Sequence, residues 1–317
     1  QPLLIGGATT SRPHTAVKIA PTFKQPVVHV KDASLAVNVV SDLLDSERKL
    51  TFDEANRASQ EELREKHANR KDKKLRPLAA AREAAFTPEW GDQPLPKPGF
   101  TGAQVLEDLD LAKLARYIDW TFFFTSWDIP RRFPAVLEDE KYGSAARDLY
   151  RDAQVLLDRI VEEELLTANM TYGFWTANSD GDDILVYDTD GGDVIERLNM
   201  LRQQQYRGDS AYACLSDFIA PVDSGLTDHV GMFAVTAGLG ADLLAQEFEN
   251  SGDDYNAIMV KALADRLAEA FAECLHEMVR TDLWGYAAKE SLSNDEMIRE
   301  KYQGIRPAPG YPACPDH

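Results

Sequence analysis

The strongest helical periodicity in the chain belongs to Ile258-Met-Val-Lys-Ala-Leu-Ala-Asp-Arg-Leu-Ala-Glu-Ala-Phe-Ala-Glu-Cys-Leu-His-Glu-Met-Val279. Its large apolar side chains recur every three or four residues, at Met259, Leu263, Leu267, Phe271, Leu275 and Met278. Charged side chains lie off that stripe, at Lys261, Asp265, Arg266, Glu269 and Glu273. The pattern predicts a long amphipathic helix with one face in a hydrophobic core.

The sequence before this helix mixes further helical and strand patterns. Residues 145–164 have a second amphipathic helical pattern, and the aromatic-rich residues 106–127 are partly helical in character. Short runs typical of strands occur at 173–175, 184–187, 194–195 and 233–236. Residues 100–317 are therefore predicted to form an α+β domain, with a mixed or antiparallel sheet and flanking helices.

The first 45 residues have a different pattern. Apolar runs at 2–5 and 27–30 indicate strands, and each is followed by a helical pattern. This βαβα order implies a parallel sheet, but two strands cannot close a core of their own. Residues 1–45 therefore resemble the tail of a doubly wound α/β domain. Because the chain starts at Gln1 rather than Met, we expect it to be a piece of a longer protein.

Two segments between these parts are predicted to be linkers, so that residues 46–99 separate the two domains. Residues 46–76 are highly charged, and residues 87–99 contain four prolines. The charged segment includes a basic run at Arg64, Lys66, Arg70, Lys71, Lys73, Lys74 and Arg76. It is either a solvated helical face or a docking surface for an acidic partner.

Composition excludes several classes of protein. A chain of 317 residues is long enough for two domains, and its net charge of −19 opposes binding to nucleic acid. The longest uncharged run, residues 165–179, has 15 residues, whereas a membrane-spanning helix needs about 20. The three cysteines are far apart, which favours a reducing compartment, and we expect a cytoplasmic protein.

No motif for acid–base, nucleophilic, phosphoryl-transfer or metal chemistry is present. The six histidines form no H-E-x-x-H and no Cys–His ligand spacing. The acidic run that starts at Asp188 has Gly192 and Asn199 at the fifth and twelfth positions, so it fails the template of a calcium loop. We therefore predict no catalytic side chain and no metal ligand.

The loop at residues 298–313 is the most informative candidate for a binding site. Three prolines and two glycines around Arg306 and Tyr311 predict a rigid extended loop. A guanidinium on such a loop is placed to grip a carboxylate, and exposed backbone beside Gly310 can read the edge of a flat ring. Composition alone leaves a structural proline loop and a ligand-binding loop equally open.

At this loop the sequence resembles the family of cobalamin-dependent methionine synthases. Arg306-Pro-Ala-Pro-Gly-Tyr311 matches the R-x-x-x-G-Y motif of that family's S-adenosylmethionine-binding activation domain. Further similar blocks are Tyr117-Ile-Asp-Trp120, Leu215-Ser-Asp-Phe-Ile-Ala-Pro221 and the long helix with its lead-in from Asp253. Leu4-Ile-Gly-Gly-Ala-Thr-Thr-Ser11 looks like the last segment of the family's cobalamin-binding domain.

The resemblance implies a set of binding residues. Arg306 would hold the carboxylate of S-adenosylmethionine, and Asp119 would pair with its amino group. Backbone around Gly310, Tyr311 and Ala313 would contact the adenine. Two further candidates near the ligand are Glu269 and Glu300. Gly6, Gly7 and Ala33 would line the pocket for the nucleotide tail of the corrin.

The resemblance also implies a function. The parent enzyme moves a methyl group from methyltetrahydrofolate to homocysteine through cobalamin, which makes it a methyltransferase. Its activation domain binds S-adenosylmethionine for the reductive methylation of cob(II)alamin, with a flavodoxin or flavoprotein reductase as electron donor. An alternative is a non-catalytic module that binds S-adenosylmethionine or docks a flavoprotein.

This chain alone is not expected to perform the full reaction of the parent enzyme. The family's D-x-H-x-x-G motif and its zinc-bearing module would precede Gln1, and further strands would follow His317. The cobalamin site is therefore expected to be only partly present. The cobalamin-binding domain of the same enzyme is an expected partner.

Overall fold

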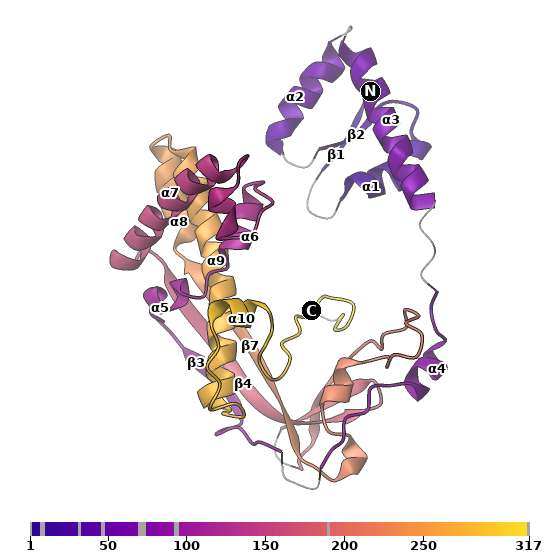
Figure 1. The fold of residues 1–317 in the computed structure, drawn as a ribbon, viewed down its shortest axis with the longest axis vertical. Coiled ribbons are helices and arrows are strands. Elements are labelled where there is room, and N and C mark those ends of the chain that lie inside the picture. Colours follow the sequence, from indigo (N-terminus) through magenta and orange to yellow (C-terminus); the bar gives the residue numbers. More distant parts are fainter. Residues whose placement is uncertain are drawn as a thin grey trace. The chain divides into compact units, whose positions relative to one another are not determined.

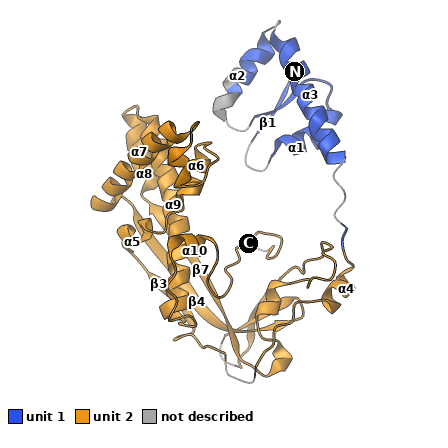
Figure 2. Cartoon of the chain, in the orientation of Figure 1, with its two compact units in different colours: residues 1–75 blue, residues 76–317 orange. Residues whose placement is uncertain are grey.

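The computed structural model describes residues 2–6, 10–30, 33–45, 48–68, 74–91, 95–188 and 191–315. The chain divides into two compact units, residues 1–75 and residues 76–317 (Figure 2).

The first unit is built on two short parallel strands. β1 (Leu3–Gly6) pairs with β2 (Val27–Val30), with Leu3 opposite Val27 and Gly6 opposite Val30. The connection between them consists of three short helical segments, α1 (Arg12–His14), η1 (Thr15–Ile19) and η2 (Ala20–Thr22). Helix α2 (Ala33–Leu44) follows β2. This element order confirms the predicted βαβα pattern.

Helix α3 (Arg48–Ala68) completes the first unit, although its charged sequence indicated only a solvated helix. Asn56 Nδ2 and Gln60 Nε2 donate hydrogen bonds to the carbonyl oxygen of Val27, at 2.9 and 2.6 Å. Phe52 packs against a small core made by Val28, Val30 and Leu43. Buried amide side chains that bond to backbone thus fix this polar helix to the start of β2.

The second unit contains one antiparallel sheet. Its strands are β3 (Gly102–Leu106), β4 (Thr167–Asp180), β5 (Asp183–Tyr187), β6 (Val194–Asn199) and β7 (Asp228–Leu239). The long strand β4 is central, because β7 pairs along one side of it while β3 and β5 pair with successive parts of the other side. The predicted strands are thus confirmed, but the sequence runs marked only parts of β4, β6 and β7.

Helix α9 (Asp254–Met278) packs against β7 of this sheet (Figure 1). Packed against α9 in turn are α5 (Leu111–Ala115), α6 (Trp120–Ser126), α7 (Gly143–Glu162) and α8 (Ala241–Asn250), and the turn η3 (Ala135–Glu138) contacts α7. Asp253 caps α9 by accepting a hydrogen bond from the backbone N–H of Asn256 at 3.0 Å. The predicted apolar stripe of α9 lies in the main core, where five of its six residues are fully buried.

After α9 the chain continues as a π-helical turn, η6 (Val279–Leu283), and the short helix α10 (Asn294–Ile298). A second, smaller core forms where β4, β5 and β6 meet the turn η4 (Leu215–Phe218). Cys314, near the end of the described chain, packs against this smaller core. The C-terminal loop therefore joins the α9 region to the far end of the sheet.

The segment before β3 is bound to the second unit. Helix α4 (Leu78–Glu83) is tied down by Arg82, whose Nε donates to Asp182 Oδ2 at 2.8 Å. The backbone N–H of Tyr212 donates to the carbonyl of Ala84 at 2.8 Å, and Trp284 Nε1 donates to the carbonyl of Pro96 at 2.9 Å. The division into three parts, residues 1–45, 46–99 and 100–317, stays a prediction. The two compact units of the structure meet at residues 75 and 76.

Candidate functional site

One face of α9 carries a charged stripe on the side away from the apolar stripe. Arg266, Glu269, Glu273 and Glu277 follow one another at spacings of three and four residues, which places them on one helix face. Glu269 is exposed, whereas Arg266, Glu273 and Glu277 are half-buried. Half-burial of charged groups means that other segments cover this face.

The segment around Asp119 is one of these covering segments. Tyr117 Oη donates a hydrogen bond to Glu277 Oε2, and the Arg266 guanidinium lies 6.0 Å from the centroid of the Phe122 ring. Asp119 lies between these two contacts in sequence. Its carboxylate caps α6 by accepting from the N–H of Thr121 at 2.8 Å. The segment thus runs along the charged stripe and holds Asp119 beside it.

Arg306, which follows α9 in the sequence, contacts the same charged stripe. Its Nη2 donates to Glu273 Oε1 in an ion pair whose side chains are 20% and 26% exposed. Glu273 lies between Arg266 and Glu277 along α9, so the Arg306 contact falls between the two contacts that flank Asp119. The fold therefore gathers Arg306, Asp119 and the carboxylates of α9 on one surface.

The loop that carries Arg306 is seated on the end of α9 by Tyr302. The guanidinium of Arg280 lies 4.3 Å from the centroid of the Tyr302 ring, and the His276 ring meets it edge-on at 4.7 Å. Arg280 is fully buried and donates through Nε and Nη2 to Glu290 Oε1, at 2.9 and 2.7 Å. Cation–π and edge-to-face contacts to a fixed arginine thus hold the loop four residues before Arg306.

Gly304 lets the loop pass close to Tyr286. Its φ of +96° lies in the region that favours glycine, and a Cβ at this position would stand 2.8 Å from Tyr286 Oη. Both the backbone angle and the close approach therefore require glycine between Tyr302 and Arg306.

His276 is kept neutral in this environment. Burial lowers its pKa from 6.5 to about 3, and the positive charges of Arg280 and Arg306 act in the same direction. The imidazole thus contributes shape rather than charge beside the two arginines.

The end of the loop folds into a tight turn. The N–H of Gly310 donates to the carbonyl of Cys314 at 2.8 Å, and the N–H of Cys314 donates to the carbonyl of Tyr311 at 2.9 Å. The N–H of Leu201 donates to the carbonyl of Ala313 at 3.2 Å, which ties the turn to the segment after β6. Tyr311 remains 67% exposed, so its ring and adjacent backbone face solvent.

The predicted residues thus fall into three places. Arg306, Asp119 and Glu269 share the α9 surface, and Gly310, Tyr311 and Ala313 lie on the C-terminal turn. Glu300 is exposed just after α10, at a φ of +53°. Sequence reasoning missed Glu273, Arg280 and Tyr302. The spacing of four residues from Glu269 to Glu273 was the available signal for the first of these.

The predicted cobalamin residues lie in the first unit. Gly6 ends β1, and a Cβ added there would stand 2.9 Å from the carbonyl oxygen of Val30 on the paired strand. Close approach of the two strands therefore explains this glycine without a ligand. Gly7 and the side chain of Ala33 lie outside the described residues.

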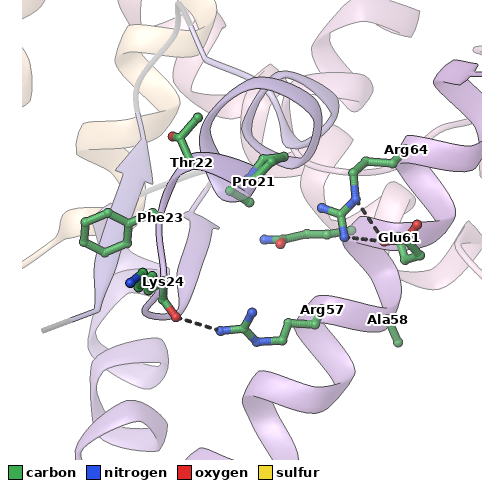
Figure 3. Close-up of a pocket in the computed structure, with 10 residues that line it drawn as sticks. Pro21, Thr22, Phe23, Lys24, Arg57, Ala58, Glu61 and Arg64 are labelled. Carbon is green, nitrogen blue, oxygen red and sulfur yellow. Dashed lines mark hydrogen bonds and ion pairs between the residues drawn. The ribbon is translucent and has the colours of Figure 1, made fainter.

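A cavity of about 840 Å³ in the first unit lies between residues 20–24 and α3 (Figure 3). Arg57 Nη2 donates to the carbonyl of Lys24 at 3.4 Å, and Arg64 Nη1 donates to the carbonyl of Ala16 at 3.0 Å. Arg57 also pairs with Asp53, and Arg64 pairs with Glu61. The chain itself therefore compensates the charge of both arginines.

The basic run predicted near the end of α3 is only partly described. Arg64 and Lys66 pair with Glu61 and Glu62 one helical turn earlier, each at 2.6 Å, as on a solvated helical face. Arg76 lies over the Tyr212 ring at 4.8 Å, and Arg70, Lys71 and Lys73 lie outside the described residues.

The described residues lack two kinds of feature. They contain no group of three or more His, Cys, Asp or Glu side chains arranged to hold a metal ion. Within the same ranges, no helix has both the length and the apolar character needed to cross a bilayer.

Comparison with known proteins gives two findings. Residues 110–317 match the family model described as the activation domain of vitamin B12-dependent methionine synthase. A solved structure described as the MetH reactivation domain bound to AdoHcy is 50% identical in sequence, with a TM-score of 0.72. The match covers 76% of this chain and 74% of that one. This chain belongs to the family of vitamin B12-dependent methionine synthase activation domains.

Proposed function

We propose that this chain binds S-adenosylmethionine and presents it for the reductive methylation of cob(II)alamin in methionine synthase. The observation that carries the proposal is the position of Arg306. Its guanidinium stands on the charged face of α9, between the two contacts that flank Asp119, in a chain 50% identical to a domain solved with AdoHcy.

The charges of the site fit this ligand. S-adenosylmethionine has one carboxylate, one ammonium and one sulfonium group, so one arginine and several carboxylates complement it. Within the described part of the chain, Arg306 Nη1 is buried and lacks a hydrogen-bond partner, which leaves a donor for the ligand carboxylate. Asp119 would receive the ammonium group, and Glu269 would add negative charge. We also propose that backbone at Gly310, Tyr311 and Ala313 contacts the adenine, and that Glu300 lies near the ligand.

The chain's part in the reaction is to bind and orient. S-adenosylmethionine supplies an electrophilic methyl group, for which reduced cobalamin is the acceptor. Arg306 and the α9 carboxylates would fix the amino-acid end, and the 310–313 turn would fix the other end. Two fixed ends would align the methyl carbon, and alignment rather than acid–base chemistry would account for the rate. No side chain of this chain is assigned a proton transfer.

The remaining assignments are also proposals. Gly6, Gly7 and Ala33 would belong to a partial site for the nucleotide tail of cobalamin, and the cobalamin-binding domain of the same enzyme would be the partner. A flavodoxin or flavoprotein reductase would supply the electron, and the basic run from Arg64 to Arg76 is the candidate docking surface. The methyltransferase activity belongs to the parent enzyme, which we place in the cytoplasm.

Calorimetric titration tests the binding proposal. S-adenosylhomocysteine (AdoHcy) is titrated into the wild-type chain, Arg306→Ala and the matched control Arg299→Ala, an exposed arginine that pairs with Asp295. We expect Arg306→Ala to weaken binding about tenfold to hundredfold, because a charge-assisted hydrogen bond is lost. The control should bind as the wild type does. Equal affinity in all three proteins would contradict the assignment of Arg306.

An activity measurement distinguishes the proposed function from the alternative, a non-catalytic module. When this chain is joined to the rest of its enzyme, reductive methylation of cob(II)alamin should fall with Arg306→Ala. Charge reversal at Lys74 and Arg76 should weaken flavodoxin binding at low salt. An unchanged flavodoxin affinity would remove the docking surface from the proposal while leaving ligand binding intact.

A further inference from the structure

The ion pair between Arg306 and Glu273 is incomplete on both sides. Among the residues that the structure describes, Arg306 Nη1 and Glu273 Oε2 are both buried without a hydrogen-bond partner. They belong to the same pair, in which Nη2 and Oε1 make the contact. One unused donor and one unused acceptor, of opposite charge, thus belong to the same ion pair.

This arrangement differs from the usual strong pairing of these groups. An arginine and a carboxylate can form two parallel hydrogen bonds, which would use both nitrogens and both oxygens. The Arg280–Glu290 pair of the same unit approaches that arrangement, with Nε and Nη2 both donating to Oε1 and Nε also lying 3.2 Å from Oε2. Leaving a charged group's polar atom buried and unpaired is unfavourable, so the Arg306–Glu273 pair gains from any ligand that satisfies both atoms.

We propose that Glu273 is a specificity-determining residue that receives the α-ammonium group of the ligand, next to the carboxylate held by Arg306. This inference rests on the proposed function and adds a residue that the sequence motif does not include. An α-amino acid carries its ammonium and carboxylate on one carbon. Those two groups therefore match a donor and an acceptor that belong to one ion pair.

The pair is placed to receive such a ligand. The two side chains are 20% and 26% exposed, so they reach solvent although the unused atoms are covered. The Arg306 loop is held independently at Tyr302, so Arg306 can rotate toward a ligand while its backbone stays in place. An ammonium group has three N–H donors, and Glu273 and Asp119 can each accept one of them.

If Glu273 had the opposite role, removing its charge would change the ligand affinity in the opposite direction. If Glu273 only occupies Arg306 until a ligand arrives, it competes with the ligand carboxylate, and removing its charge tightens binding. If it receives the ammonium group, removing its charge weakens binding. The unpaired Oε2 favours the second role, because a mere competitor would use both oxygens on the arginine.

The experiment compares three ligands and five forms of the full chain by calorimetry. The ligands are AdoHcy, its analogue without the amino group and its analogue without the carboxylate. The proteins are the wild type, Glu273→Gln, Arg306→Met and the control Glu163→Gln, which alters an exposed glutamate paired with Arg159. Thermal unfolding checks that each variant is folded, and Glu273→Asp serves as a second variant with an intact charge.

A crossed pattern is expected. Glu273→Gln should weaken the binding of AdoHcy and of the analogue without the carboxylate about tenfold to hundredfold. It should leave the binding of the analogue without the amino group unchanged. Arg306→Met should show the reverse pattern: it should weaken the binding of the analogue without the amino group and leave the binding of the analogue without the carboxylate unchanged. Glu273→Asp should lose less affinity than Glu273→Gln, and Glu163→Gln should match the wild type.

Two failures can be told apart. If the wild type binds none of the ligands, the proposed function fails and the inference fails with it. If the wild type binds AdoHcy but Glu273→Gln binds it equally well or more tightly, the proposed function stands and the role of Glu273 is wrong. Equal weakening of both analogues by Glu273→Gln would also overturn that role, since it would mark a general loss of the site.

Discussion

Arg306 and Glu273 form an ion pair across 33 residues of sequence, and it joins a proline-rich loop to the C-terminal part of α9. The contact places Arg306 on the helix face that also receives the Asp119 segment. One nitrogen of Arg306 donates to Glu273, whereas two nitrogens of Arg280 donate to Glu290 in the pair a few residues away. One of these pairs is suited to hold the loop in place, and the other to bind a ligand.

Replacing Tyr302 tests how the loop is held. Tyr302→Leu should destabilise the second unit by about 1–3 kcal/mol, since it removes the contacts with Arg280 and His276. Tyr302→Phe keeps the ring and should behave as the wild type. Thermal unfolding and AdoHcy titration of both variants measure the effect. Equal behaviour of the two variants would contradict a role for the aromatic ring.

Replacing Gly304 tests the close approach to Tyr286. Gly304→Ala should destabilise the fold through its φ of +96° and through the clash of its Cβ with Tyr286 Oη. Gly252→Ala is a matched control, because Gly252 has a φ of +81° with open space around its Cβ position. Urea unfolding should show a larger loss for Gly304→Ala by about 1 kcal/mol or more. A smaller or equal loss would mean that Tyr286 yields without cost.

His276 should make stability depend on pH. Its pKa is about 3 in the folded chain and 6.5 as its usual value, so the unfolded chain binds more protons between these values. Stability should therefore fall as the pH drops from 6.5 toward 3, by at most about 1.4 kcal/mol per pH unit from this group. His276→Phe should remove this component. Denaturant unfolding from pH 4 to 8 compares the variant with His67→Gln, an exposed control on α3.

Arg202 should be essential for the smaller core. It is 8% exposed and donates to Asp217 at 2.7 and 2.9 Å and to Asp182 at 2.7 Å. Arg202→Met should cost about 3–5 kcal/mol, because it leaves the buried carboxylate of Asp217 without its cation and leaves Asp182 with Arg82 alone. Adding Asp217→Asn should recover part of that loss. Chemical denaturation measures both, and a loss below that of the exposed variant Arg197→Met would contradict the prediction.

Local pattern was enough to predict several elements of this chain. The spacing of Met259, Leu263, Leu267 and Phe271 predicts α9 and its buried face, because burial repeats with the helical period. The βαβα order of the first unit likewise follows from two apolar runs that each precede a helical pattern. Strand lengths were underestimated, because β4 contains polar residues that pair well in a sheet but break an apolar run.

The candidate site was only partly predictable. The resemblance identified Asp119 and Arg306 as binding residues, and the structure brings both to α9. It did not indicate Glu273, Arg280 or Tyr302. Charged residues off an apolar stripe are usually solvated, so nothing local marked Glu273 as half-buried.

The sequence by itself therefore determined which segments form helices and strands, and which family the chain resembles, because periodicity and motifs are local properties. Only the tertiary structure decided that the Asp119 segment and the Arg306 loop meet on one face of α9. Contacts between residues far apart in sequence depend on how the elements pack, and packing sets which charges are paired and which buried atoms remain free for a ligand.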